Sequence, residues 1–227
     1  MSVFSNACYQ AKFEANPNNR YVLLDVDGHK FRLGERISNC AMTSLGWRTF
    51  SFDEVKDGLD YTYDRVLVDR KTQREVGLAQ VKFSFRPNEI KYHVIATPSE
   101  PIDLGSAKSL LESLVWPVNP ESFNGCMVRA EYPDGTFGMN EYIVKDGYDP
   151  KKWGVGSYRM SRWELATETY ILSAIADEGC DVSLFRSFPP DGKGLTCAVN
   201  TPRPESAGWQ YLWDKPISHG FNLQFLK

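Results

Sequence analysis

The dipeptide Asp27-Gly28 stands between two apolar runs, RYVLLDV and HKFRLGE, and this arrangement constrains the fold more than any other feature of the sequence. A two-residue type I′ turn needs positive φ at both central positions, and Asp-Gly is among the pairs that tolerate it. Apolar runs on either side of such a turn pair as antiparallel strands. The sequence therefore predicts a β-hairpin over residues 20–35.

Alternating apolar and polar residues recur along the chain and predict further antiparallel pairing. In residues 76–86 the alternation places Val81, Phe83 and Phe85 on one face and polar side chains on the other, as in a half-buried sheet. The segments expected to pair are 61–68, 76–86 and 90–96 in a meander, and 126–132 with 136–144 and 182–188 with 195–200 in two hairpins. We expect a chain rich in antiparallel strands.

Two segments carry helix signals. Residues 103–116 predict a helix that ends before Pro117, because the residue before a proline avoids the helical region. Ser161 and Glu164 have the spacing of a capping box, apolar residues follow at helical intervals, and Gly179 suits the end of a helix. The sequence thus predicts an α+β fold of antiparallel hairpins and a meander with two main helices, without a parallel doubly wound sheet.

The loop PVNPESFNG follows the first predicted helix and marks a candidate boundary between two halves. Residues 1–117 would form an N-terminal β-meander half, and residues 118–227 a C-terminal hairpin-helix-hairpin half. A single domain over residues 1–227 is the alternative, because this length suits one large domain or two small ones.

Composition and charge restrict the class of protein. Of the 227 residues, 42% are apolar and 24% are charged, which is typical of a globular chain and not of a disordered one. The formal charge of -3 argues against binding of nucleic acid or membrane by bulk charge, although it is compatible with a local basic patch. No apolar stretch is long enough to predict a membrane-spanning helix.

The cysteines are odd in number and far apart, and no two of them form a C-x-x-C pair: Cys8, Cys40, Cys126, Cys180 and Cys197. This pattern argues against a disulfide framework and against a structural zinc site. The first twenty residues also lack the basic start and apolar run of a secretory signal. We therefore expect reduced thiols, a cytoplasmic protein, and neither a metal nor a cofactor.

The segment from Lys145 to Arg162 combines basic and aromatic residues with two glycines. Cations that hold phosphates, an aromatic ring for stacking and the N-terminus of the predicted Ser161 helix are the parts of a strand-binding groove. The candidate binding residues are Lys151, Lys152, Trp153, Arg159 and Arg162. The leading hypothesis is a non-catalytic binding protein of a larger assembly, whose partner is a nucleic-acid strand or an acidic protein surface.

A phosphohydrolase is the first alternative. The segment VLLDVDG, residues 22–28, resembles the first motif of haloacid-dehalogenase-type phosphohydrolases, an apolar strand followed by D-x-D-G. The resemblance implies that Asp25 is the nucleophile and Asp27 the general acid/base. It covers these seven residues, and the chain continues with His29-Lys30 where the family has Thr and an apolar residue.

An inhibitor or scaffold that uses its aromatic C-terminal tail is the other alternative. Trp209, Tyr211 and Trp213 recur at a spacing of two and so share one face of a strand, and such side chains are enriched at interfaces. The three histidines form no compact metal-ligand or nucleophile pattern. This scarcity favours a binding protein over an enzyme.

A second, weaker basic patch is expected in the meander. If residues 76–86 and 90–96 pair across the turn at Pro87–Glu89, Lys82 and Arg86 share the polar face with Lys91 and His93.

Overall fold

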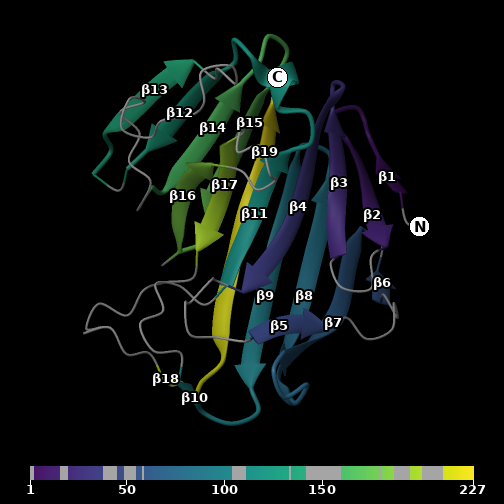
Figure 1. Cartoon of the computed structure of the whole chain (residues 1–227). Helices are drawn as coiled ribbons and strands as arrows, with labels where there is room; N and C mark the ends of the chain where they lie inside the picture. Colours follow the sequence, from purple (N-terminus) through teal and green to yellow (C-terminus); the bar gives the residue numbers. More distant parts are fainter. Residues whose placement is uncertain are drawn as a thin grey trace.

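A computed structural model shows a β-sandwich (Figure 1) and describes residues 3–15, 20–37, 45–48, 55–57, 59–103, 111–132, 134–141, 160–178, 180–186, 195–200 and 212–227. All pairs of strands within these ranges are antiparallel. The helical element there is one short 3-10 turn, η1 (Pro120–Phe123).

Two large sheets and one short pair make up the fold. The seven-stranded sheet has the order β1 (Val3–Ser5), β2 (Gln10–Ala15), β3 (Arg20–Val26), β4 (His29–Ile37), β11 (Leu111–Pro117), β17 (Leu195–Asn200) and β16 (Asp181–Arg186). The ten-stranded sheet has the order β13 (Phe137–Glu141), β12 (Met127–Glu131), β14 (Arg162–Ala166), β15 (Ile171–Ala176), β19 (Ile217–Leu226), β9 (Glu89–Pro98), β8 (Glu75–Arg86), β7 (Asp60–Asp69) and β5 (Leu45–Arg48), with β6 (Val55–Asp57) also paired to β7. Strands β10 (Ile102–Asp103) and β18 (Leu212–Trp213) pair separately.

An aromatic core joins the two sheets. Phe13 on β2 lies edge-on to Phe83 and Phe85 on β8, with ring centroids 5.9 and 6.0 Å apart. Such edge-to-face pairs add to the stabilisation from burial. Beside them the buried hydroxyl of Tyr9 donates to the carbonyl of Arg86 at 2.7 Å. The inner face of the ten-stranded sheet is therefore fixed against the smaller sheet, and its outer face carries the polar positions of each strand.

The predicted hairpins and meander are confirmed. Asp27 and Gly28 have φ of 53° and 84°, and they connect Val26 to its register partner His29 in a two-residue turn. Strands β7, β8 and β9 form the expected meander, and β12 pairs with β13 and β16 with β17. The buried residues of β8 include Val81, Phe83 and Phe85, as the alternation predicts.

The two predicted helices are wrong, and the part of the chain that the structure describes is nearly all β-strand rather than α+β. Of the first, residues 104–110 lie outside the described ranges, and its last part is strand β11. This strand pairs with β4 on one side and with β17 on the other. Pairing with two neighbours satisfies its backbone groups at long range, and this outweighs the local helix signal.

The second helix is replaced by the hairpin of β14 and β15. Thr167 forms the turn between them: its hydroxyl accepts from the amide of Tyr170 at 3.1 Å and donates to the carbonyl of Tyr170 at 3.0 Å. Trp163 and Leu165 face the core from β14, and their spacing of two is that of a strand. The apolar residues of this segment therefore fit a strand as well as a helix. Glu164 lies within strand β14 and caps no helix, and its carboxylate instead contacts Arg162 and Arg129.

Both halves of the sequence contribute to both large sheets. Strand β11 of residues 1–117 pairs with β17 of residues 118–227, and β9 pairs with β19 in the other sheet. The described ranges hold no helix that could cross a membrane.

Candidate binding pocket and polar outer face

A pocket of about 680 Å³ lies where turns from the two sheets meet. The β3–β4 turn provides Asp27 and His29, and the chain around η1 and the start of β12 provides Ser122, Asn124, Gly125, Cys126 and Met127. The β14–β15 turn provides Ala166, Thr167, Glu168 and Thr169. Pockets for small ligands usually measure about 300–1,000 Å³, so a molecule of one or two rings would fit.

His29 forms one wall of the pocket and rests on aromatic rings. Its imidazole lies 4.9 Å from the ring of Phe123 and 5.5 Å from that of Tyr170. The Nδ1 atom of His29 is buried and has no hydrogen-bond partner among the described residues. A buried polar atom without a partner costs free energy.

The charge of the pocket is negative. Asp27 and Glu168 are the charged residues among the described ones that line it. Burial and the Glu168 carboxylate raise the pKa of the Cys126 thiol. Burial, followed by Cys126, Asp27 and Asp25, likewise raises the pKa of the Tyr170 phenol. The pocket therefore suits a neutral or cationic ligand, and Cys126 stays a protonated thiol, which is a poor nucleophile.

The two aspartates of the D-x-D-G segment have structural roles in the hairpin. The Asp25 carboxylate accepts a hydrogen bond from the Gly28 amide at 3.0 Å and lies 4.0 Å from the Lys30 ammonium. Asp27 occupies the left-handed position of the turn. The segment is an antiparallel hairpin, so it lacks the strand-end arrangement on which the resemblance to phosphohydrolases depends. No group of three His, Cys, Asp or Glu side chains in the described part of the chain could hold a metal ion.

Most of the predicted binding loop lies outside the described residues. This holds for Lys151, Lys152, Trp153 and Arg159, so their contact with a nucleic-acid strand or an acidic surface stays a prediction. Arg162 is on β14, where its Nε donates to the Ser173 hydroxyl at 2.8 Å. Its charge is balanced there by the Glu164 carboxylate at 2.5 Å. The helix predicted to begin at Ser161 is absent, because Ser161 directly precedes strand β14, so it adds no helix N-terminus to the predicted binding groove.

The predicted aromatic tail also lies partly outside the described residues. Trp213 is buried, and its indole nitrogen donates to the Lys215 carbonyl at 2.8 Å. It thus belongs to the core and not to an exposed interface. Trp209 and Tyr211 lie outside the described residues.

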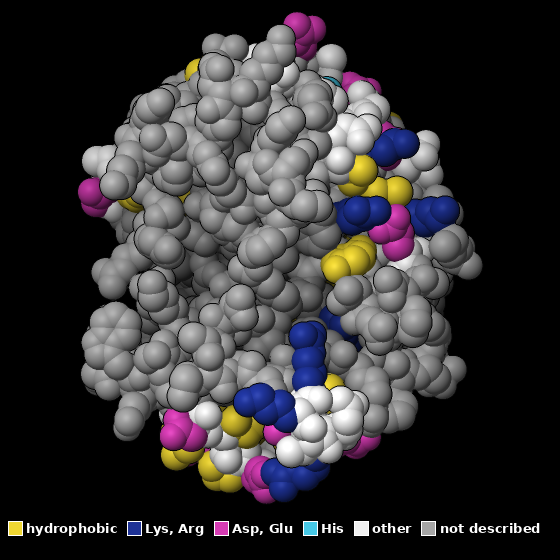
Figure 2. Space-filling model, in the orientation of Figure 1, with side chains coloured by type: hydrophobic (Ala, Val, Ile, Leu, Met, Phe, Trp, Pro, Cys, Tyr) yellow, Lys and Arg dark blue, Asp and Glu magenta, His cyan; other side chains and the backbone are white. Residues whose placement is uncertain are grey.

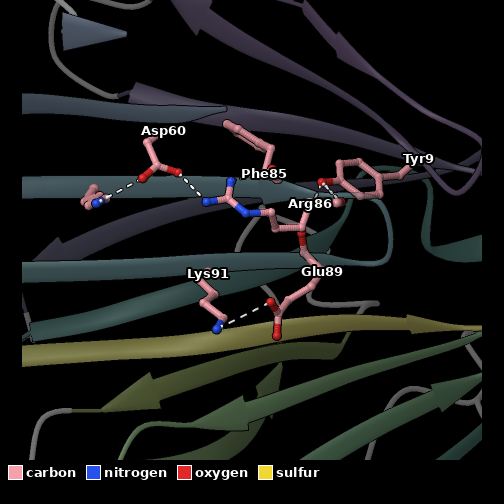
Figure 3. Close-up of polar contacts among 7 residues, drawn as sticks. Tyr9, Asp60, Phe85, Arg86, Glu89 and Lys91 are labelled. Atoms are coloured by element: carbon pink, nitrogen blue, oxygen red, sulfur yellow. Dashed lines mark hydrogen bonds and ion pairs between the residues drawn. The ribbon is translucent and has the colours of Figure 1, made fainter. Parts of the chain in front are cut away.

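The expected patch of Lys82, Arg86, Lys91 and His93 does form on the outer face, but carboxylates neutralise its lysines and its arginine. The Asp60 carboxylate lies 3.1 Å from the Lys82 ammonium and 2.9 Å from the Arg86 guanidinium. The Glu89 carboxylate lies 3.5 Å from the Lys91 ammonium (Figure 3). Burial alone would raise the pKa of Asp60, but hydrogen bonds from its neighbours, Lys82 first, lower it overall. In Figure 2 the described basic side chains are likewise interspersed with acidic and hydrophobic ones.

Together with the ion pairs of β12 and β14, these contacts form what we call the outer network: Asp60, Lys82, Arg86, Glu89, Lys91, Arg129, Arg162 and Glu164. Each cation in it contacts a carboxylate. Sequence reasoning named Lys82, Arg86, Lys91 and Arg162 but not Arg129, and it could not assign their carboxylate partners. It also missed His29, Cys126 and Glu168 as pocket residues, because they belong to three separate turns.

The comparisons with known proteins give a fold and no family. No protein-family model and no curated protein sequence matches this chain. Among solved structures, the chain is similar to an alpha-N-acetylgalactosaminidase from Bifidobacterium bifidum in complex with GalNAc, with a TM-score of 0.53 and 7% identity. The similarity covers 100% of this chain and 36% of the enzyme, so the chain spans about a third of that enzyme's length. At this identity the likeness shows the fold alone.

Proposed function

We propose that this protein binds a small, hydroxyl-rich ligand, neutral or cationic, in the pocket between the β3–β4 turn and the β14–β15 turn. The observation that carries the proposal is the unbalanced set of acceptors there: Asp27 and Glu168 line the pocket with no described lysine or arginine beside them. Carboxylates accept hydrogen bonds from the hydroxyls of a sugar, and amides both donate hydrogen bonds to them and accept hydrogen bonds from them.

The other lining groups support the same ligand class. Ser122, Asn124 and Thr169 add hydroxyl and amide groups. An anion would meet two carboxylates and no compensating charge among the described lining residues, which disfavours phosphorylated ligands. Binding of this kind needs no chemical step, in keeping with the expectation of a non-catalytic protein.

Isothermal titration calorimetry with three related sugars tests the proposal. GalNAc is the first probe because it is the ligand of the enzyme that shares the fold, galactosamine adds a positive charge, and GalNAc 1-phosphate adds a negative one. We expect galactosamine and GalNAc to bind, and the phosphate to bind more weakly than either. Absence of binding by all three, or tightest binding by the phosphate, would contradict the proposal.

Variants locate the site. Glu168→Gln and Asp27→Asn should each weaken galactosamine binding about tenfold or more, because hydrogen bonds to a charged group are worth roughly 1.5–3 kcal/mol. Asparagine also tolerates the left-handed backbone of position 27, so the turn is kept. Asp64→Asn is the matched control, since Asp64 is exposed on β7 and does not line the pocket.

A further inference from the structure

Three polar side chains lie next to one another on the outer face of the ten-stranded sheet. The Ser218 hydroxyl is 3.2 Å from Nε2 of His93, and Nδ1 of His93 is 3.5 Å from a carboxylate oxygen of Asp177. They come from β19, from β9 and from the turn that follows β15. A hydroxyl, an imidazole and a carboxylate in this order are the parts of a nucleophilic triad, which is recognised by geometry and not by sequence position.

The fold brings these groups together through the pairing of β9 with β19. His93 is the register partner of Gly220, and Ser218 is two residues from Gly220, so Ser218 and His93 are diagonal neighbours on one face. Both side chains point outward, because the residue between Ser218 and Gly220, His219, is buried.

Gly220 makes room for the third group. A Cβ atom at this position would collide with the Asp177 carboxylate and with the carbonyl of Tyr92. The Asp177 amide donates to the Gly220 carbonyl at 3.1 Å, which fixes the turn over β19. The carboxylate thus occupies the space that a side chain would fill, and from there it reaches His93.

We propose that Ser218, His93 and Asp177 form a hydrolytic triad that cleaves short-chain carboxylic esters. Asp177 accepts the Nδ1 hydrogen of His93 and so turns the free lone pair of Nε2 toward Ser218. The Ser218 oxygen attacks the ester carbonyl carbon while its proton passes to Nε2. The tetrahedral intermediate then expels the alcohol, which takes that proton from His93, and leaves an acyl-serine.

Water completes the cycle. A water molecule gives a proton to His93 and attacks the acyl-serine, and collapse of the second intermediate releases the carboxylic acid and returns the proton to Ser218. The sum is one ester and one water converted to one acid and one alcohol, without an oxidant, a metal or a cofactor. No residue of the triad lines the pocket, so the inference stands independently of the proposed binding function.

The surroundings of Ser218 favour a short acyl chain. Its register partner is Ile95, which is 42% exposed, and Leu78, on the neighbouring strand, is 58% exposed. Both residues alternate with buried neighbours and so share the outer face. The side chains of His93 and Asp177 are 44% and 47% exposed, so the site is open. A small alkyl group can lie on the two exposed side chains, whereas a long chain would find little further apolar surface among the described residues.

The test is hydrolysis of p-nitrophenyl acetate and p-nitrophenyl butyrate by the full chain, compared with its Ser218→Ala variant. We expect Ser218→Ala and His93→Ala to lower the protein-catalysed rate by roughly 100-fold. Ser99→Ala is the control, since Ser99 is an exposed serine outside the triad. Its rate should equal that of the unchanged protein, which separates the triad from reactions of surface nucleophiles.

Two further readouts make the result decisive. A fluorophosphonate should phosphonylate Ser218, as peptide mass spectrometry would show, and His93→Ala should abolish the label. Asp177→Asn should lower kcat and leave KM unchanged, which a merely structural role of Asp177 would not produce. Equal hydrolysis by the unchanged protein and the Ser218→Ala variant, or absence of a Ser218 adduct, would overturn the proposal.

Discussion

The binding pocket and the outer network are both polar, but they differ in how their charges are balanced. In the outer network each cation contacts a carboxylate, as Arg162 does with Glu164 at 2.5 Å. In the pocket the carboxylates of Asp27 and Glu168 face no described cation. A balanced set has its interactions satisfied within the protein, whereas an unbalanced set keeps capacity for a ligand.

This difference separates the consequences of mutation in the two regions. Removing a carboxylate from the outer network leaves cations without partners, so it should lower stability and leave sugar binding unchanged. Removing a carboxylate from the pocket should weaken binding at little cost in stability, because neither Asp27 nor Glu168 would lose a hydrogen bond or ion pair to a described residue. Binding sites often carry such groups at the expense of stability.

Glu164→Ala should have the largest effect on stability. The Glu164 side chain is only 10% exposed and contacts both Arg129 and Arg162. We expect its loss to lower the free energy of unfolding by about 1–3 kcal/mol, a value between those of exposed and buried pairs. Urea denaturation measures the change. A midpoint equal to that of the unchanged protein would show that the outer network contributes nothing to the fold.

Asp60→Asn should have the next largest effect and should also alter the pH dependence of stability. In the folded state the pKa of Asp60 lies below its ordinary value of 3.8, because hydrogen bonds from its neighbours outweigh the effect of burial. Its contribution is therefore present above pH 3.8 and is lost as the pH falls through the lower folded value. We expect a cost of about 1 kcal/mol at pH 7. The cost should vanish in strong acid, where both forms are neutral.

The thiol of Cys126 reports on the charge of the pocket. Because Glu168 contributes to its raised pKa, Glu168→Gln should lower that pKa and speed alkylation by iodoacetamide about threefold. Cys8, a half-buried free thiol outside the pocket, is the internal reference and should keep its rate. Mass spectrometry follows both sites in one sample. Equal acceleration at both thiols would indicate general loosening instead of a change in charge.

The same substitution should have the smallest effect on folding. Glu168 is exposed and lies in a turn, so Glu168→Gln should change the free energy of unfolding by less than about 0.5 kcal/mol. Thermal melts of this variant and of Glu164→Ala, recorded together, compare the two regions directly. If Glu168→Gln lowered the melting temperature as much as Glu164→Ala, the pocket and the outer network would not differ in their contribution to stability.

Local signals predicted the parts of this fold that local chemistry decides. The Asp27-Gly28 turn needs a backbone that few residue pairs tolerate, and alternation in β8 and β9 leaves one register that buries the aromatic side chains. The segment 161–176 contained a capping-box spacing and apolar residues compatible with either period. This segment forms strands and not a helix because it pairs with β12 and β19, and the sequence does not reveal that pairing.

The candidate sites could not be predicted for a related reason. His29, Cys126 and Glu168 each look like ordinary turn or edge residues, and only the meeting of three turns places them around one pocket. No fixed spacing marks such a site. The expected basic patch shows the converse, because its cations were visible in the sequence and their carboxylate partners were not.

An amide chemical-shift titration of the full chain with galactosamine tests the distinction most directly. If the unbalanced carboxylates of the pocket serve a ligand, saturable shifts will concentrate at Asp27, Asn124, Gly125 and Thr169, and the strands of the outer network will stay unchanged. Glu168→Gln should weaken the titration without altering the spectrum elsewhere. Shifts centred on Asp60 and Glu164, or no saturable shift at any concentration tested, would contradict the assignment of ligand binding to the pocket.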